Sequence, residues 1–243
     1  FRGGTIRFAT LNGEPLDGYD QQTARVHLPE DRLVTVNEVR ISASQAYDTG
    51  GVGLHRFRDP EDGAVYLYTD FEPFNAHRVF PCFDQPDLKA TYDVEIESPD
   101  DWKVIANGRV VECSGINEGM VRRRFAAPWP FSTYLFAIAA GPYHEVRSTD
   151  DRCDLGLYCR RSLAAHLDHD AIFELTRQGF AFYGEHFGVA YPFGKYDQLF
   201  VPEYNSGAME NIAAVTFNEK YLFRDRPTER DLLGRAEVIL HEL

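Results

Sequence analysis

Two neighbouring residues near the end of the chain, His241 and Glu242, are of the types that support zinc chemistry. They match the first half of the pattern H-E-x-x-H, in which two histidines on one helix face share a zinc ion and the glutamate acts as general base. If only these two residues are considered, His241 is better interpreted as an ordinary histidine on a helix surface than as a zinc ligand, because a His-Glu dipeptide often occurs by chance. A second motif is needed to choose between the two interpretations.

The second motif is the stretch PEYNSGAMENIAAVTF, residues 202–217. Gly207 would let a ligand backbone approach closely. The carboxylate of Glu210 could pair with a cationic group, while the strand that follows offers an edge to an extended peptide. The alternative is a glycine turn that enters an edge strand, with Glu210 in contact with water. The residues by themselves leave both interpretations open.

The elements that must position these residues lie in the last part of the chain. Thr228 and Asp231 match the capping pattern [ST]-x-x-[DE], which predicts a helix that begins near Glu229 and carries both zinc-type residues. Three earlier segments have apolar residues at helical or strand-like spacing: 162–187 for a helix, and 191–204 and 211–217 for strands. A mixed α and β unit is therefore expected here.

The preceding part of the chain has a different pattern. From residue 5 to about 141 it consists of short β-branched and aromatic runs separated by Gly, Pro, Asn and Asp, which is typical of strands joined by turns. We therefore predict an all-β domain over residues 1–146, truncated at its start, and a second domain over residues 147–243.

Composition narrows the classes of partner and compartment. The formal charge of −13 argues against binding to phosphate backbones, so no nucleic-acid partner is expected. No run of 18 apolar residues exists, and no membrane association is expected. Four scattered cysteines without a C-x-x-C pair favour a reducing, cytoplasmic compartment. Cys153 and Cys159 could still pair across a local turn; the alternative is two ordinary buried thiols.

The motif GAMEN at residues 207–211, followed by HE at residues 241–242, resembles the M1 family of zinc aminopeptidases, of the aminopeptidase N type. The resemblance extends over nearly all of the chain, including residues 67–96 (LYTDFEPFNAHRVFPCFDQPDLKATYDVEI), 132–143, 155–163 and 193–211. It implies an all-β saddle-like N-terminal domain followed by the first part of an α+β thermolysin-like catalytic domain, which ends inside the zinc-binding helix.

The resemblance also implies a role for single residues. Glu210 would hold the free α-amino group of the substrate, together with Glu72 from the N-terminal domain. Asp70 stands where relatives more often have glutamine, which leaves the sharing of the amino end open at that position. The other expected substrate-binding residues are those of the same motif, Gly207, Ala208, Met209 and Asn211.

For the metal and the reaction, the resemblance implies that His241 is the first zinc ligand and Glu242 the general base. The complete protein would use one zinc ion to remove N-terminal amino acids from peptides with a free N-terminus, as a monomer. Two alternatives from other classes remain: a non-catalytic scaffold with this fold, and a module that binds peptide N-termini.

The remaining zinc ligands and the oxyanion-stabilising tyrosine that the family implies lie outside the 243 residues. Because a single imidazole holds zinc only weakly, we predict that this chain by itself neither binds stoichiometric zinc nor cleaves peptides. Metal analysis of the purified chain tests this prediction, and one tightly held zinc ion per chain would contradict it.

Overall fold

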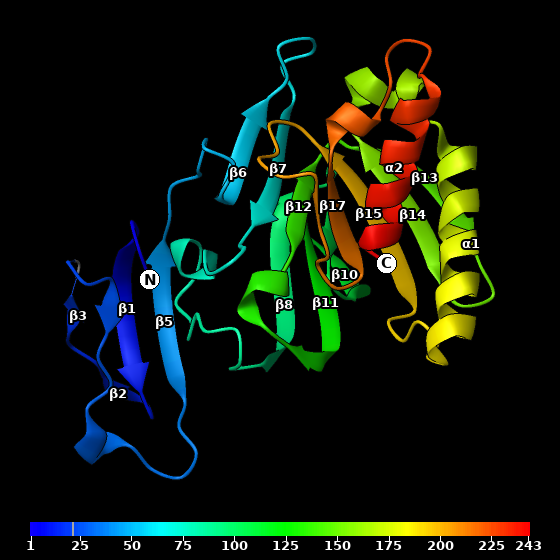
Figure 1. Ribbon diagram of the computed structural model, residues 1–243. Coiled ribbons are helices and arrows are strands. Elements are labelled where there is room, and N and C mark those ends of the chain that lie inside the picture. The colour runs from blue at the N-terminus through cyan, green and yellow to red at the C-terminus, as the bar shows by residue number, and fades with distance from the viewer. Residues whose placement is uncertain (21) are drawn as a thin grey trace.

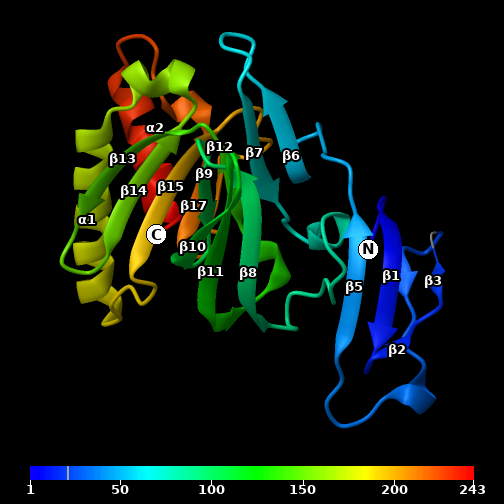
Figure 2. The ribbon, with the colours of Figure 1, turned by 180° about the vertical axis from the view of Figure 1, so that it is seen from behind.

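The computed structural model describes residues 1–20 and 22–243. The chain begins with two small antiparallel sheets at one end of the molecule (Figures 1 and 2). The first sheet has the order β2-β1-β5, and the second pairs β3 with β4. Their strands are β1 (Thr5–Leu11), β2 (Glu14–Pro15), β3 (Tyr19–Asp20), β4 (Arg25–Val26) and β5 (Val39–Ser44).

Two larger antiparallel sheets follow and complete the β-domain. One has the order β6-β7-β12-β9 and the other the order β10-β11-β8. Their strands are β6 (Gly53–Arg58), β7 (Val65–Asp70), β8 (Ala90–Pro99), β9 (Lys103–Ala106), β10 (Arg109–Asn117), β11 (Met120–Phe131) and β12 (Ile138–Gly141). The predicted all-β character of this part of the chain is therefore confirmed.

The second unit is built on a five-stranded mixed sheet with the order β13-β14-β15-β17-β16. Its three central strands run parallel, and an antiparallel strand closes each edge. The strands are β13 (His144–Thr149), β14 (Asp154–Cys159), β15 (Lys195–Val201), β16 (Ala208–Met209) and β17 (Ala214–Asn218), and the helices are α1 (His169–Phe187) and α2 (Glu229–His241). The division predicted between residues 146 and 147 falls inside β13 and stays a prediction.

Strand β15 is buried along its whole length because both faces of the sheet are covered. Successive side chains of a strand point to opposite faces. Tyr196 and Phe200 accordingly pack in the core beneath α1 and α2, while Leu199 and Val201 pack against Tyr66, Tyr68 and other residues of the β-domain. The helices lie on one side of this sheet and the β-domain on the other (Figures 1 and 2).

Two expectations about local structure need correction. The helical pattern over residues 162–187 covers a 3-10 helix, Arg161–His166, before α1 begins at His169. Leu163 and Leu167 are buried there, so the apolar spacing continues although the backbone is not α-helical. Likewise, the part of the chain predicted to consist of strands joined by turns contains a 3-10 helix, Thr133–Leu135, directly before β12.

The four cysteines are free thiols, and Cys153 and Cys159 are both buried, in agreement with the interpretation as ordinary core residues. No helix within the described residues combines the length and the apolar composition needed to cross a membrane.

A buried ion cluster joins the β-domain to the second unit. Asp59, which follows β6, is 0% exposed, and Arg160, which follows β14, is 5% exposed. Arg160 donates to Asp59 Oδ2 at 2.6 Å and to both carboxylate oxygens of Glu219 at 2.8 and 2.9 Å. Burial opposes ionisation of Asp59, but hydrogen bonds from Ser162, the Glu61 N–H and Arg160 hold the pKa of Asp59 below its ordinary value.

The substitution Asp59→Asn should lower the free energy of unfolding by about 3 kcal/mol, because it removes one partner of a buried ion pair. The control is Asp93→Asn, which breaks an ion pair with Arg124 between exposed side chains and should change stability little. Urea unfolding followed by circular dichroism measures both. Equal effects of the two substitutions would contradict the role assigned to the buried cluster.

Candidate active site

Helix α2 begins where the capping pattern predicts. The Thr228 hydroxyl accepts the Asp231 N–H at 3.3 Å, and the Thr228 N–H donates to Asp231 Oδ2 at 2.8 Å, which forms a reciprocal capping box. Farther along, Arg235 is buried and donates to Asp168 Oδ2 at 2.9 Å, while Ile239 is buried in the core. The start and the inner face of the helix that carries His241 and Glu242 are thus fixed by separate contacts.

The last turn of α2 is held by two tyrosines and by close packing on α1. The Tyr183 hydroxyl donates to the Leu240 carbonyl at 3.1 Å, and the Tyr196 hydroxyl to the Glu242 carbonyl at 3.4 Å. A Cβ atom at Gly179 would lie 2.5 Å from Leu243 Cδ1 and 2.7 Å from Leu240 Cδ2. Any larger residue at this position would therefore require the side chains of Leu240 and Leu243 to shift.

The two zinc-type residues have opposite environments. His241 is exposed and lines a surface groove of about 490 Å³ between α1, the loop 189–193 and the end of α2. Glu242 is 8% exposed, and its Oε2 atom has no hydrogen-bond partner among the residues described. Burial, and next the negative charges of Glu210 and Glu72, raise the pKa of Glu242 to about 7. This carboxyl is therefore poised to exchange a proton near neutral pH.

The predicted substrate motif forms the edge of the five-stranded sheet. Ala208 and Met209 make up β16 and pair with Phe217 and Thr216 of β17. A Cβ atom at Gly207 would lie 3.2 Å from the Tyr221 hydroxyl and 3.8 Å from Val238 of α2, so this backbone runs close beside the helix that bears Glu242.

Within this motif, Glu210 is exposed, whereas the side chains of Met209 and Asn211 are buried. The Asn211 amide donates to Thr216 Oγ1 at 3.2 Å, which ties the end of the motif to β17. Contact of Met209 or Asn211 with a substrate would therefore fall to backbone atoms. The assignment of all five motif residues to substrate binding stays a prediction.

Glu72 comes from the other domain, two residues after the end of β7, and is exposed. Its charge acts on the same groups as that of Glu210: both raise the pKa of Glu242, and both add to the effect of burial that raises the pKa of Tyr134. Two carboxylates from two domains thus act electrostatically on a common region, which includes Glu242 and Tyr134. Tyr134 belongs to this region but was not predicted from the sequence, since an isolated tyrosine in a strand-like run carries no signal.

Asp70 is a further carboxyl of the same region. It is 7% exposed, and its pKa is raised to about 6, mainly by burial, with the Glu72 N–H opposing and the Glu72 charge adding to the shift. The buried Tyr68 hydroxyl beside it has no hydrogen-bond partner among the described residues. Among the described residues these carboxyl groups have no ion-pair partner, and an ammonium group would complement them.

The described residues do not make up a complete zinc site. No group of three or more His, Cys, Asp or Glu side chains is placed to hold a metal ion within residues 1–20 and 22–243. The exposed imidazole of His241 could supply one ligand to a zinc ion, whereas a catalytic zinc centre uses about three protein ligands. A larger cavity of about 760 Å³ lies between β4, β5 and residues 80–83, and none of the candidate residues lines it.

The raised pKa of Glu242 has a consequence for the metal-free chain. Below about pH 4.5 the carboxyl of Glu242 is neutral in both the folded and the unfolded chain. As pH rises from about 4.5 to about 7, the carboxyl ionises in the unfolded chain first, so the free energy of unfolding falls. The loss persists above pH 7. Glu242→Gln should remove this loss and gain roughly 2–3 kcal/mol over the natural chain at pH 8, with little difference at pH 4.

Urea unfolding at several pH values measures the difference between the two chains. The control is Glu237→Gln on the same helix, where the carboxylate is exposed to water in the folded chain and no such gain is expected. A gain for Glu242→Gln that does not vary with pH would contradict the prediction.

Comparisons with known proteins agree with this arrangement. A family model described as the peptidase M1 N-terminal domain matches residues 13–135, and one described as the peptidase family M1 domain matches residues 172–243. Aminopeptidase N of Streptomyces lividans is 47% identical over 98% of this chain and 28% of its own length. Glutamyl aminopeptidase of Homo sapiens is 31% identical over 79% of this chain and 20% of its length.

A probable M1 family aminopeptidase of Encephalitozoon cuniculi is 32% identical over 81% of this chain and 23% of its own length. The chain therefore spans between a fifth and somewhat more than a quarter of the length of these relatives. One family match falls in each structural unit, and the fold expected from the resemblance is confirmed. The chain belongs to the peptidase M1 family.

Proposed function

We propose that this chain is part of a longer aminopeptidase that removes residues from the N-termini of peptides. The observation that carries the proposal is that the motif with Glu210 runs beside helix α2, which leads to Glu242, while Ile212 of the same motif packs against the core cluster that contains Phe71, the neighbour of Glu72. The charges of Glu72 and Glu210 accordingly raise the pKa of Glu242. The names of the relatives support the same reaction class. Neither the scaffold nor the binding-module alternative is better supported by an observation.

In this proposal Glu72 and Glu210 bind the α-ammonium group of the substrate. Charge-assisted hydrogen bonds to two carboxylates stabilise a charged amine, while an internal peptide segment offers no charge and leaves both acids unpaired. The position of the ammonium group then sets which peptide carbonyl lies beside Glu242. The edge strand β16 supplies backbone groups of Ala208 to an extended peptide in the same orientation.

Glu242 transfers the proton. Its Oε2 atom, which has no hydrogen-bond partner among the residues described, accepts a proton from the attacking water and returns it to the leaving amine. His241 would be one ligand of a zinc ion, and the other ligands would come from parts of the longer protein outside these 243 residues. When bound, zinc supplies Lewis-acid polarisation of the carbonyl and a more acidic water.

We also propose that the protein acts in the cytoplasm, as a monomer, without nucleic-acid or membrane partners. Free thiols at all four cysteines and the net charge of −13 support the compartment and the absence of a nucleic-acid partner.

In the longer protein, Glu210→Ala should raise KM and lower kcat for leucine p-nitroanilide, with a fall in kcat/KM of about a hundredfold, because binding and positioning of the amine are lost together. The control is Glu185→Ala, which removes an exposed glutamate on α1. Steady-state kinetics of the purified enzymes measure both. Unchanged constants for Glu210→Ala would remove the role proposed for this residue.

A further inference from the structure

We propose that Asn107, a buried residue of the β-domain that belongs to none of the recognised motifs, is a positioning residue for Glu210. The inference rests on the proposed function, since it concerns how the amine-binding carboxylate is held. Asn107 is 7% exposed and follows β9. It acts through the backbone of the turn that directly follows Glu210.

The side-chain amide of Asn107 makes hydrogen bonds within the β-domain and one hydrogen bond to the second unit. Its Nδ2 donates to the Ile212 carbonyl and to the Leu135 carbonyl, each at 2.8 Å, and its Oδ1 accepts the Ala137 N–H at 2.8 Å. Two carbonyls and one N–H around it match an amide in one orientation only. Asn107 thereby joins the β-domain segment that carries Tyr134 to the turn that follows Glu210.

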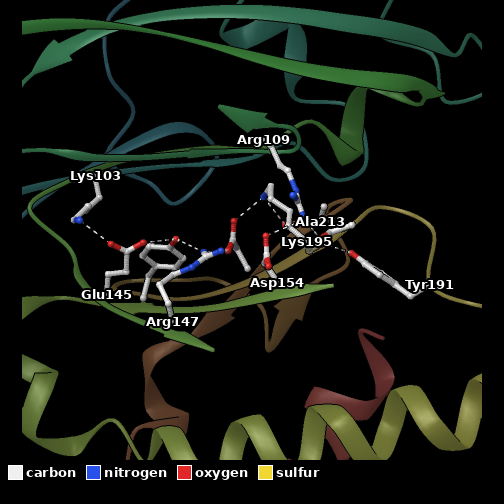
Figure 3. A network of polar contacts seen from close by, with 11 residues as sticks. Lys103, Arg109, Glu145, Arg147, Asp154, Tyr191, Lys195 and Ala213 are labelled. Atoms are coloured by element: carbon white, nitrogen blue, oxygen red, sulfur yellow. Dashed lines mark hydrogen bonds and ion pairs between the residues drawn. The ribbon is translucent and has the colours of Figure 1, made fainter. Parts of the chain in front are cut away.

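The same turn is held from the opposite side by the sheet. Ala213 has a φ of +60°, a conformation that costs energy for a residue with a side chain. Its carbonyl accepts Lys195 Nζ at 2.7 Å and the Asp197 N–H at 3.1 Å. Lys195 is itself buried and paired with Asp197 at 2.6 Å, and it lies in the polar network of Figure 3.

Successive carbonyls after Glu210 are thus all occupied. The Asn211 carbonyl accepts the Ala214 N–H at 3.1 Å, the Ile212 carbonyl accepts Asn107, and the Ala213 carbonyl accepts Lys195. The Glu210 carboxylate, in contrast, has no hydrogen-bond or ion-pair partner among the described residues. Only its backbone is therefore held in place. Asn107 gives this backbone a directional hydrogen bond to the domain of Glu72, in addition to the packing of Ile212 against the core cluster that contains Phe71.

The position of Asn107 is itself constrained by its neighbour. A Cβ atom at Gly108 would lie 2.1 Å from the Ala126 carbonyl oxygen, so only glycine allows β9 and β10 to continue past β11 at this point. Because the backbone at Asn107 is fixed, its side-chain amide holds its hydrogen-bond partners at defined positions. Two carboxylates from different domains share one ammonium group only if their separation is maintained, and this contact adds a directional constraint to the apolar packing at the junction.

The test uses the longer, zinc-loaded protein with the substitutions Asn107→Ala and Asn107→Ser. The serine variant leaves room for water beside the freed carbonyls and is the milder change. The probes are the hydroxamates of leucine and of 4-methylpentanoic acid, which differ only in the α-amino group. The measurement is the ratio of the two inhibition constants. Circular dichroism and metal content check that each variant is folded and loaded.

The expected result is that the advantage of the amine-bearing inhibitor falls about tenfold in the Asn107 variants, with the inhibition constant of the amine-free inhibitor unchanged. The control is Asn205→Ala, which removes another amide-to-carbonyl hydrogen bond across the junction, 2.8 Å to Gly50, and should keep the natural ratio. Should the alanine variant not fold, the serine variant decides.

Two outcomes would overturn the inference: an unchanged ratio in a folded Asn107 variant, or equal weakening of both inhibitors, which indicates general damage. Failure of the proposed function is distinguishable. In that case the natural enzyme itself shows no preference for the amine-bearing inhibitor and no hydrolysis of leucine p-nitroanilide.

Discussion

The arrangement of the site depends on the burial of β15 on both faces. On one face, Tyr196 and Phe200 pack under the helices, and Tyr196 also holds the carbonyl of Glu242. On the other face, Leu199 and Val201 share a core with Tyr66 and Tyr68 of the β-domain. Because one strand is common to both cores, the helix that carries Glu242 and the strand that leads to Glu72 are held in a fixed relation by apolar packing.

Against this rigid frame, the polar groups of the site are left unsatisfied. Glu242 Oε2 and the Tyr68 hydroxyl are buried without partners among the described residues, and burial raises the pKa of Asp70 and Glu242. Uncompensated buried acids cost folding free energy, whereas the ion cluster of Asp59 and Arg160 at the same junction is fully paired. The contrast separates the groups that hold the domains together from those whose buried polar atoms have no partner among the described residues.

Features encoded in a few adjacent residues were predicted from the sequence. The start of α2 follows from Thr228 and Asp231 because a capping box is a local interaction, and the strand pattern of the β-domain is likewise local. The 3-10 helix before α1 was missed because buried Leu163 and Leu167 keep the helical spacing. Glu72 entered only through the resemblance. Asn107 could not be found, since its partner Ile212 lies 105 residues away.

The shared core also bears on the order in which the protein is made. During synthesis the β-domain leaves the ribosome first, and its face with Tyr66, Tyr68 and Ala139 has no cover until β15 and β17 have followed. An apolar face that waits for a later segment is open to association with other chains. Folding of the β-domain is therefore coupled to translation of the second unit, and the two units are better regarded as a single cooperative body than as successive modules.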